Sequence, residues 1–461
     1  MAITGALDGN RGDARKPLPP FPPLDGQLVT DEAAVAEAAD DFGHIVHRVP
    51  RAILRPRSAA DVAAVVRVAG EHGIGVVARG EGHSTFGQAQ AADGIVIDMR
   101  TLCSVREVGP DRVVVEAGAS WRGLLAETLR HGLTPPVLTD YLGLSVGGTL
   151  AVGGVGGAAH RFGAQTDTVE ELDVVTGEGS VLTCGPGRNE DLFHAVLAGH
   201  GQCGIITRAT LRLVRAPERT RQLKLSFPSA KALIAAQRQA LHEGRFDYLG
   251  GGMAVAAQGW RFFMEGVSYC SAPDAPGDSD LVADLGHLPG SEESKDSAYS
   301  DFADRLGGAE TYLRRTGEWL APHPTWNAFL PDSSVDEFMG RLVDEIVPDD
   351  LGASGMVVVY PVLTERVRTP LLRVPNEPLA FVVELLRYGP ADDDEVRRMV
   401  MANREWYERA RDLGGVAYPV GSIPFGKADW RAHLGPAEPR FAAAKRRYDP
   451  HRILGPGLEM C

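Results

Sequence analysis

A short glycine-punctuated loop lies between two apolar runs in the first hundred residues. The loop at 79–84 reads Arg-Gly-Glu-Gly-His-Ser, and the apolar runs 75–78 and 94–99 flank it. A strand, a loop and a second strand are the simplest interpretation. Gly80 and Gly82 let the backbone adopt conformations that a Cβ would exclude, so a flat or anionic ligand can approach the peptide groups. His83 would then stand at the edge of a backbone cradle. A surface turn carrying an ordinary histidine is the alternative that this loop leaves open.

The chain is too long for a single hydrophobic core. Its 461 residues are expected to form two large domains. The formal charge of -14 argues against nucleic acid or an anionic membrane as a partner, because both call for a basic face. The cluster Lys445-Arg446-Arg447 is predicted to be a solvated helix face. No segment has the apolar length of a membrane span and no secretion signal is recognised, so a cytoplasmic protein is expected.

Cysteine and histidine spacing predicts neither a disulfide framework nor a metal site. The five cysteines are scattered without a C-x-x-C pair, which favours reduced thiols. His160, His194 and His200 lack metal-ligand spacing and are expected to be structural. No motif for a nucleophilic serine or cysteine is present. No metal is therefore expected.

Helical and strand-like segments are mixed along the chain. Ser58 is the expected cap of a helix after the strand at 52–55, and residues 171–184 read as a hairpin. Beyond a boundary near Pro217 the strand-like runs 260–267, 355–360 and 380–386 alternate with helical stretches. Residues 272–295, acidic and rich in Ser, Gly and Pro, are predicted to be a surface connection.

The densest glycine region, 143–157, offers a second candidate cofactor site. Residues 154–159 formally match the G-x-G-x-x-A dinucleotide fingerprint. A Rossmann turn should follow a buried strand directly and open a helix, whereas here further glycines precede the match and His-Arg-Phe-Gly follows it. A loop of backbone amides along a cofactor's pyrophosphate is the better functional interpretation. A purely structural glycine loop is the alternative.

Two carboxylates are the best acid–base candidates. Asp140 stands in a mostly apolar stretch beside the glycine-rich region, and desolvation makes a carboxylate a stronger base. Glu265 ends the apolar run 262–264, and in an alternating strand it shares a face with Phe263 and Val267. Pairing with a nearby arginine or capping of a turn is the alternative for each carboxylate.

These segments, in this order, resemble the cytokinin dehydrogenases, flavoproteins with the vanillyl-alcohol-oxidase (PCMH) type of FAD-binding domain. The resemblance spans nearly the whole chain from 41–43 onward, so it is more specific than any single motif. It rests on Arg79–Ser84 with Gln88, Thr139–Leu142, Val146–Leu150, Glu171–Gly177, Gly201–Arg208, Pro322–Pro324 with Asn327, Tyr360-Pro361, Leu385–Arg387, Asp429-Trp430 with His433, and Tyr448–Pro450.

The resemblance implies a fold, a cofactor and residue roles. The implied fold is α+β: a PCMH-type FAD-binding domain of two α/β subdomains plus an antiparallel-sheet substrate (cap) domain with flanking helices. The expected bounds are 1–217 for the FAD-binding domain, 218–420 for the cap domain, and 421–461 for a C-terminal segment that returns to the FAD-binding domain. His83 matches the histidine joined covalently to FAD, and Asp140 matches the base that takes the substrate N–H proton while hydride passes to flavin N5. Glu265 matches a glutamate of the cap domain that lines the pocket and binds the adenine-like group, and Asn327 and Pro361 match other residues of that pocket. The other implied cofactor-binding residues are Arg79, Gly80, Glu81, Gly82, Ser84, Gln88, Thr139, Gly147, Gly148, Thr149, Gly153, Gly204 and Ile206.

Departures from the family pattern bear on the substrate. The tryptophan of plant members two residues before the matching asparagine is Thr325 here, with Trp326 adjacent. The family's tail motif S-P-G-Q reads Gly-Pro-Gly-Leu at 455–458, and the segment 417–421, near the flavin edge in the family, also differs. No cysteine lies near Asp140, where bicovalent relatives attach the flavin a second time, so linkage through His83 alone is expected.

Three functions stay open at this point. The first is oxidation of a cytokinin-like or other secondary amine, with Asp140 as base. The second keeps the fold but oxidises an alcohol or a natural-product intermediate. The third is a flavin-binding protein without redox turnover. In all three the partner is a small molecule, and the electron acceptor, oxygen or a quinone, is left open.

Overall fold

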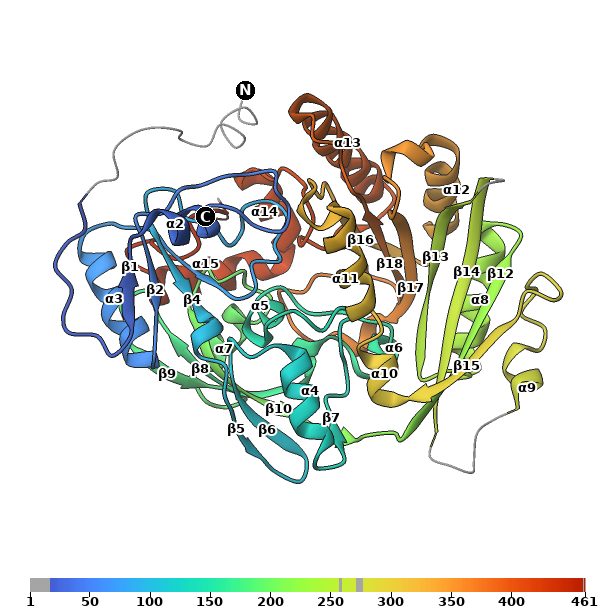
Figure 1. Cartoon of the computed structure of the whole chain (residues 1–461), viewed down its shortest axis with the longest axis horizontal. Coiled ribbons are helices and arrows are strands. Elements are labelled where there is room, and N and C mark those ends of the chain that lie inside the picture. Colours follow the sequence, from blue (N-terminus) through green and yellow to red (C-terminus); the bar gives the residue numbers. More distant parts are fainter. Residues whose placement is uncertain (1–16, 257–258, 271–276, 459, 461) are drawn as a thin grey trace.

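The computed structural model of the chain describes residues 17–256, 259–270, 277–458 and 460. Two halves lie side by side in Figure 1. One contains two smaller sheets with their helices, and the other contains a single large sheet flanked by helices. The predicted α+β class, with an FAD-type α/β half and an antiparallel cap, is confirmed.

The first sheet is the mainly parallel one that carries the His83 loop. β2 and β3 run parallel to β4, while β1 pairs antiparallel with β2. Helix α3 (Ala59–Glu71) connects β2 to β3, and Ser58 caps it as predicted, because its Oγ accepts a hydrogen bond from the Asp61 N–H. The strand order is β1 (Gln27–Val29), β2 (Ala52–Arg55), β4 (Ile95–Asp98), β3 (Val76–Arg79), and α2 (Glu32–Ala38) packs beside β2.

The second sheet is antiparallel throughout and supports the glycine-rich region. β8 and β9 form the predicted hairpin, and β10 lies at the centre between β6 and β8. The strand order is β5 (Val105–Val108), β6 (Arg112–Glu116), β10 (Ile205–Arg212), β8 (Val169–Val175), β9 (Val181–Cys184). Its helices are α4 (Trp121–Leu129), α5 (Val146–Leu150), α6 (Ala159–Phe162) and α7 (Glu190–Val196), and a two-stranded piece pairs β7 (Leu133–Thr134) with β11 (Val214–Arg215).

Within the described residues the third sheet has eight strands, and neighbouring strands in it run antiparallel. The strand order is β15 (Glu293–Ala298), β12 (Arg219–Phe227), β14 (Gly259–Cys270), β13 (Tyr248–Ala256), β17 (Met356–Leu363), β18 (Leu379–Leu386), β16 (Trp326–Pro331), β19 (Val416–Ala417). The segment 272–295 is not only a surface connection: residues from Glu293 onward form the edge strand β15, and α9 (Asp278–Val282) precedes it. Its residues 272–276 lie outside the described part of the chain.

The two faces of the large sheet bury different partners. Side chains alternate along each strand, so one face of β14, β17 and β18 presents Met264, Val359 and Leu385 to helices, and the next residues face the opposite way. The helices that complete this core are α8 (Ala230–His242), α12 (Val335–Glu345) and α13 (Asp393–Asp412). The opposite face of the sheet turns toward the first half (Figure 1).

The C-terminal segment returns to the first half. The Val76 N–H donates to the Ile453 carbonyl at 2.7 Å, and the Gly455 N–H donates to the Val76 carbonyl at 3.0 Å, so the tail extends the edge of β3. Lys445 was predicted to be solvated, but it is buried, and its ammonium lies 2.7 Å from the Asp449 carboxylate. The helices here are α14 (Lys427–Leu434) and α15 (Glu438–Tyr448). The domain boundaries proposed from the sequence stay a prediction.

Two short helices bridge the halves over the space between them. α10 (Tyr299–Ala303) and α11 (Gly307–Thr316) follow β15, and the 3-10 turn η3 (Glu318–Leu320) follows α11. The Arg122 guanidinium on α4 pairs with Asp304, between α10 and α11, at 2.8 Å. No helix within the described residues combines the length and apolarity needed to cross a membrane.

Candidate active site

A cavity of ≈ 720 Å³ lies between the two halves. The loop after β3, the segment 139–155 and the tail enclose one part of it, while β13, β14, β16, β17 and β18 with α11 enclose the other. Most of the exposed area of its lining is apolar, with a few charged groups, as in many small-molecule sites. Tail residues Gly455 and Leu458, the departures from the family motif, are part of the wall.

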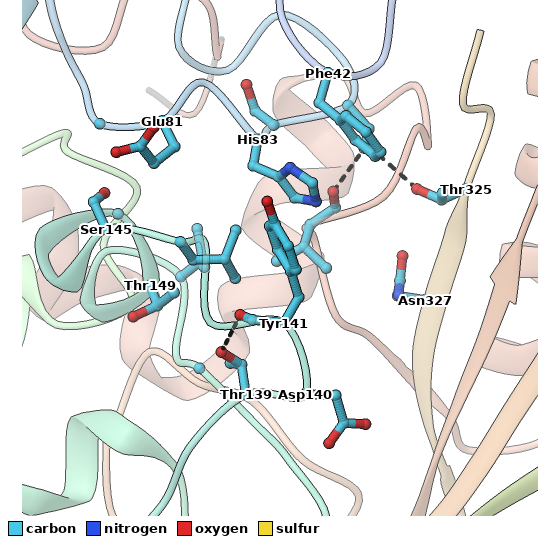
Figure 2. A pocket seen from close by; sticks show the side chains of 18 of the residues that line it. Phe42, Glu81, His83, Thr139, Asp140, Tyr141, Ser145, Thr149, Thr325 and Asn327 are labelled. Atoms are coloured by element: carbon cyan, nitrogen blue, oxygen red, sulfur yellow. Dashed lines mark hydrogen bonds between the residues drawn. The ribbon is translucent and has the colours of Figure 1, made fainter. Parts of the chain in front are cut away.

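His83 faces this cavity from the loop after β3. Its ring stacks on Phe42, with centroids 3.9 Å apart, and lies 5.1 Å from the Tyr141 ring. Figure 2 shows His83 between these two side chains. Burial lowers the pKa of His83 to about 3, so the imidazole is neutral at physiological pH. Gly82 makes the turn possible: its φ is 68°, and a Cβ there would lie 2.3 Å from the Arg79 guanidinium.

The Asp41 carboxylate fixes the His83 loop against the preceding segment. It accepts hydrogen bonds from the Gly43 N–H at 3.1 Å, the Ser84 hydroxyl at 2.9 Å and the Gly87 N–H at 2.7 Å. Burial raises the pKa of Asp41 to about 6 despite these bonds. One side chain thus joins Ser84 and Gly87, which follow His83, to the chain segment that carries Phe42.

Glycines allow close packing between the His83 loop (79–84) and the glycine-rich region (143–157) and around them. A Cβ on Gly80 would lie 1.9 Å from the Ser145 Oγ, and one on Gly147 would lie 2.7 Å from the Ala117 Cβ. The fully buried Trp121 donates through Nε1 to the Thr149 hydroxyl at 2.8 Å, which anchors the end of the second loop. The result is a wall built largely of backbone, along which a long, flat cofactor with anionic groups could lie. The residues present therefore fit FAD.

Asp140 and Glu265 approach each other across the cavity through Arg305. The Arg305 guanidinium lies 3.0 Å from Asp140 Oδ1 and 3.7 Å from Glu265 Oε2. The Tyr248 hydroxyl donates to the same Asp140 oxygen at 2.9 Å and accepts from Arg305 at 2.7 Å. Among the described residues, no hydrogen bond reaches Asp140 Oδ2. Both carboxylates therefore pair with an arginine, which was the alternative left open by the sequence. This pairing leaves one oxygen of Asp140 without a hydrogen bond.

The large sheet forms the floor of the cavity. β13 contributes Gly250 and Gly251, which offer a flat backbone surface without side chains. Glu265 from β14 stands on one side of them, and burial raises its pKa, an effect that the Arg305 charge opposes. Asn327 from β16 and Glu384 from β18 stand on the other side. Figure 2 shows Asn327 and Asp140 at different edges of the open space around Tyr141.

Most of the residues predicted from the sequence line this cavity. They are Gly80, Glu81, Gly82, His83, Ser84, Gln88, Thr139, Asp140, Gly147, Gly148, Thr149, Gly204, Ile206, Glu265 and Asn327. Three predicted residues, Arg79, Gly153 and Pro361, are not part of the wall.

These three residues have other surroundings. The Arg79 guanidinium donates to the Asp40 carbonyl and lies over Gly82. A Cβ on Gly153 would lie 2.9 Å from Leu372. In β17 the alternate residues Met356, Val358 and Tyr360 line the cavity, so Pro361 falls on the other face of the strand.

Several cavity residues escaped the prediction from sequence. Glu384 could have been found, because it is a charge inside the apolar run 381–386, the same signal that identified Glu265. Arg305 carries no such signal, since it lies in a polar stretch 165 positions from Asp140. The aromatic residues Tyr248, Tyr360, Tyr418 and Trp319 also line the cavity.

Comparison with known proteins gives consistent matches along the chain. A family described as "FAD binding domain" matches residues 50–185, and one described as "Cytokinin dehydrogenase 1, FAD and cytokinin binding" matches residues 274–460. An uncharacterized oxidoreductase of the fasciation locus of Rhodococcoides fascians is 40% identical over 438 residues, which cover 95% of this chain and 99% of that protein. Cytokinin dehydrogenase 5 of Oryza sativa subsp. japonica is 38% identical over 94% of this chain and 90% of its own. Cytokinin dehydrogenase 1 of the same plant is 34% identical over 100% of this chain and 96% of its own.

Proposed function

We propose that this chain, which belongs to the cytokinin dehydrogenase family of FAD-dependent oxidoreductases, oxidises a cytokinin-like secondary amine with Asp140 as the base. The observation that carries the proposal is the state of the Asp140 carboxylate. It stands between the His83 side of the cavity and the sheet floor, with one oxygen bonded and one free. The family supplies the FAD-dependent redox chemistry, and the substrate class and residue roles are our proposal.

FAD, when bound, supplies a hydride acceptor at its N5 atom. The proposed contacts come from the loop after β3 and from the glycine-rich segment. Gly80, Gly82, Gly147 and Gly148 leave backbone along the wall. We propose that His83 joins the flavin covalently, and its neutral imidazole supports this, because a ring nitrogen then carries a free lone pair.

Asp140 would accept the proton of the substrate amine. A hydride leaves the carbon next to nitrogen with its electron pair, and the amine proton moves to the free Oδ2, so the substrate becomes a neutral imine. Removal of that proton avoids a full cation on nitrogen. Arg305 and Tyr248 hold the other oxygen and thereby orient the carboxylate. The imine can then be hydrolysed by water.

The remaining predicted pocket residues would bind the ring and side chain of the substrate. Glu265 can accept a hydrogen bond from a ring N–H, and the backbone of Gly250 and Gly251 beside it can receive a flat ring. Asn327 offers an amide on the far side of the floor. Pro361 lies behind this wall, so its contribution would be to shape Tyr360 rather than to contact substrate.

An anaerobic reduction panel tests the proposed function. Purified protein, yellow with flavin, is mixed without oxygen with N6-substituted adenines and with alcohols of similar size. Bleaching by the amines and not by the alcohols is expected. The reverse result would favour alcohol oxidation, and an oxidised flavin after every compound would favour a binding protein without turnover. The control is Asp332→Asn, because Asp332 pairs with Arg238 at 2.5 Å and does not line the cavity.

Acid precipitation tests the covalent link separately. The yellow colour should remain in the pellet, and colour in the supernatant would contradict attachment. We also propose a cytoplasmic location, which fractionation of the source cells tests.

A further inference from the structure

A third carboxylate, Glu384, faces the cavity from the sheet floor. In the register of the sheet it lies opposite Asn327 on β16 and opposite Val358 on β17. Asn327, Val358 and Glu384 all line the cavity, as does Leu386 two residues along β18. The neighbours of Glu384 in sequence, Val383 and Leu385, pack into the core on the other side of the sheet. Its carboxyl group therefore turns to the cavity and away from the helices.

Within the described part of the chain, Glu384 has no counter-ion. No Lys, Arg or His nitrogen lies within 4.0 Å of its carboxylate, in contrast to Glu265 and Asp140, which share Arg305. Burial raises the pKa of Glu384 to about 7, the charge of Asp140 adds to this effect, and a hydrogen bond from Asn327 opposes it. The Asn327 Oδ1 is itself buried without a hydrogen-bond donor among the described residues. Two acceptors thus stand side by side: Glu384 has the Asn327 amide as a donor but no cation, and the Asn327 Oδ1 has no donor among the described residues.

A hydrogen-bond acceptor that lacks donors is costly in a protein interior. A carboxyl group with one amide donor and no cation is less favourable there than an apolar side chain, and its neighbours on the same face of β18, Val382 and Leu386, are apolar. A ligand that supplies a donor would satisfy the Asn327 Oδ1 and would add a hydrogen bond to the Glu384 carboxylate.

The distance between Glu265 and Glu384 indicates which end of an elongated ligand would reach Glu384. β14 and β18 are three strand steps apart, through β13 and β17. At about 4.8 Å a step, the two glutamates are separated by roughly 14 Å across the sheet. Asp140 raises the pKa of both carboxyl groups, so it lies within electrostatic reach of each end. The floor therefore has an arginine-paired acidic end at Glu265 and an unpaired acidic end at Glu384.

We propose that Glu384 and Asn327 form a subsite for a hydrogen-bond donor, a hydroxyl or an amino group, at the end of the substrate remote from Glu265. This inference rests on the proposed function, because it assumes that an elongated amine spans the floor past Asp140. It assigns the preferred substrate to a class: N6-substituted adenines whose side chain ends in a donor, rather than in a plain hydrocarbon.

The test compares ligands that differ only at that end. N6-(3-methylbut-2-enyl)adenine, its terminally hydroxylated analogue and its terminal amine analogue are titrated into FAD-loaded protein, and binding is read from the change in flavin absorbance. Anaerobic bleaching of the same samples gives kcat/KM. The variants are Glu384→Leu, which removes the acceptor, and Glu384→Gln, which keeps the shape and removes the charge. Glu365→Gln, a change of a side chain that is 72% exposed, is the matched control.

The wild type should bind the donor-bearing ligands at least tenfold more tightly than the hydrocarbon. Glu384→Leu should lose a factor of about 10–100 for the donor-bearing ligands and bind the hydrocarbon as well or better. Glu384→Gln should retain part of the hydroxyl preference and lose the amine preference. An unchanged preference in both variants, or no preference in the wild type, would overturn the subsite.

The two proposals fail in different ways. Binding with the expected preference but without bleaching would overturn the proposed oxidation and support the subsite. Bleaching by all three ligands with equal kcat/KM would support the oxidation and overturn the subsite. If Glu384→Leu does not fold, the amine-to-hydrocarbon ratio in Glu384→Gln decides, because an amide cannot replace the charge.

Discussion

Replacement of Asp140 by asparagine separates its proposed role as a base from its structural role. Among the described residues, two side chains donate hydrogen bonds to the carboxylate, Tyr248 at 2.9 Å and Arg305 at 3.0 Å, and both bonds end on Oδ1. An amide oxygen can occupy that position and accept both. The NH₂ group then takes the place of Oδ2, which accepts no hydrogen bond from the described residues. Asp140→Asn therefore removes the free oxygen and leaves the network in place.

The structure sets the expected magnitudes of this change. Loss of a positioned general base lowers the rate by about 100- to 10,000-fold. Arg305 still lies 3.7 Å from Glu265, so its charge keeps a partner. The free energy of unfolding should fall by no more than about 1–2 kcal/mol, because two hydrogen bonds to a charge become hydrogen bonds to a neutral oxygen. Flavin content and substrate affinity should change little.

The assay is anaerobic stopped-flow reduction of the bound flavin, with denaturant unfolding in parallel. Asp332→Asn is the control, since this aspartate also pairs with an arginine but lies away from the cavity. A reduction rate for Asp140→Asn within about threefold of wild type would refute the role of base. A slow rate accompanied by loss of flavin or of stability would show instead that the carboxylate holds the site together.

Three further predictions follow from the same geometry. His83→Ala should release all flavin on acid precipitation, because the proposed link is the only one, and colour retained in the pellet would contradict it. Folding raises the pKa of Asp41 from 3.8 to about 6, so its contribution to stability is present below pH 3.8 and is lost as the pH rises through 6. The free energy of unfolding, measured in urea, should therefore fall between pH 3.5 and pH 7. In Asp41→Asn this fall should be smaller by about 3 kcal/mol. Arg305→Met leaves the carboxylates of Asp140 and Glu265 without their shared cation, so the free energy of unfolding should fall by about 3 kcal/mol or more, and unchanged stability in urea would count against the pairing.

Much of the fold could be predicted from local sequence patterns. The cap at Ser58, the hairpin β8–β9 and the strand around Glu265 were predicted because each depends on residues a few positions apart. The same rule explains two errors. Lys445 lies in a basic run that suggests exposure, but it is buried and its ammonium pairs with the Asp449 carboxylate. Glu293 lies in a polar stretch that suggests a loop, but it pairs in register with Lys224 in the edge strand of the large sheet. Composition alone could not reveal either partner.

In the candidate site, too, local features could be predicted from the sequence and long-range contacts could not. The sequence by itself determined the His83 loop, the Asp140 segment and the family to which they belong, because ordered motifs and the alternation of strands are properties of neighbouring residues. Only the tertiary structure decided that Arg305 joins Asp140 to Glu265 and that Glu384 faces the same cavity without a cation. These are contacts between residues far apart in the chain, and they exist only once the large sheet packs against the first half. The physical reason is that the charge state and the free lone pairs of a carboxylate depend on what surrounds it in space.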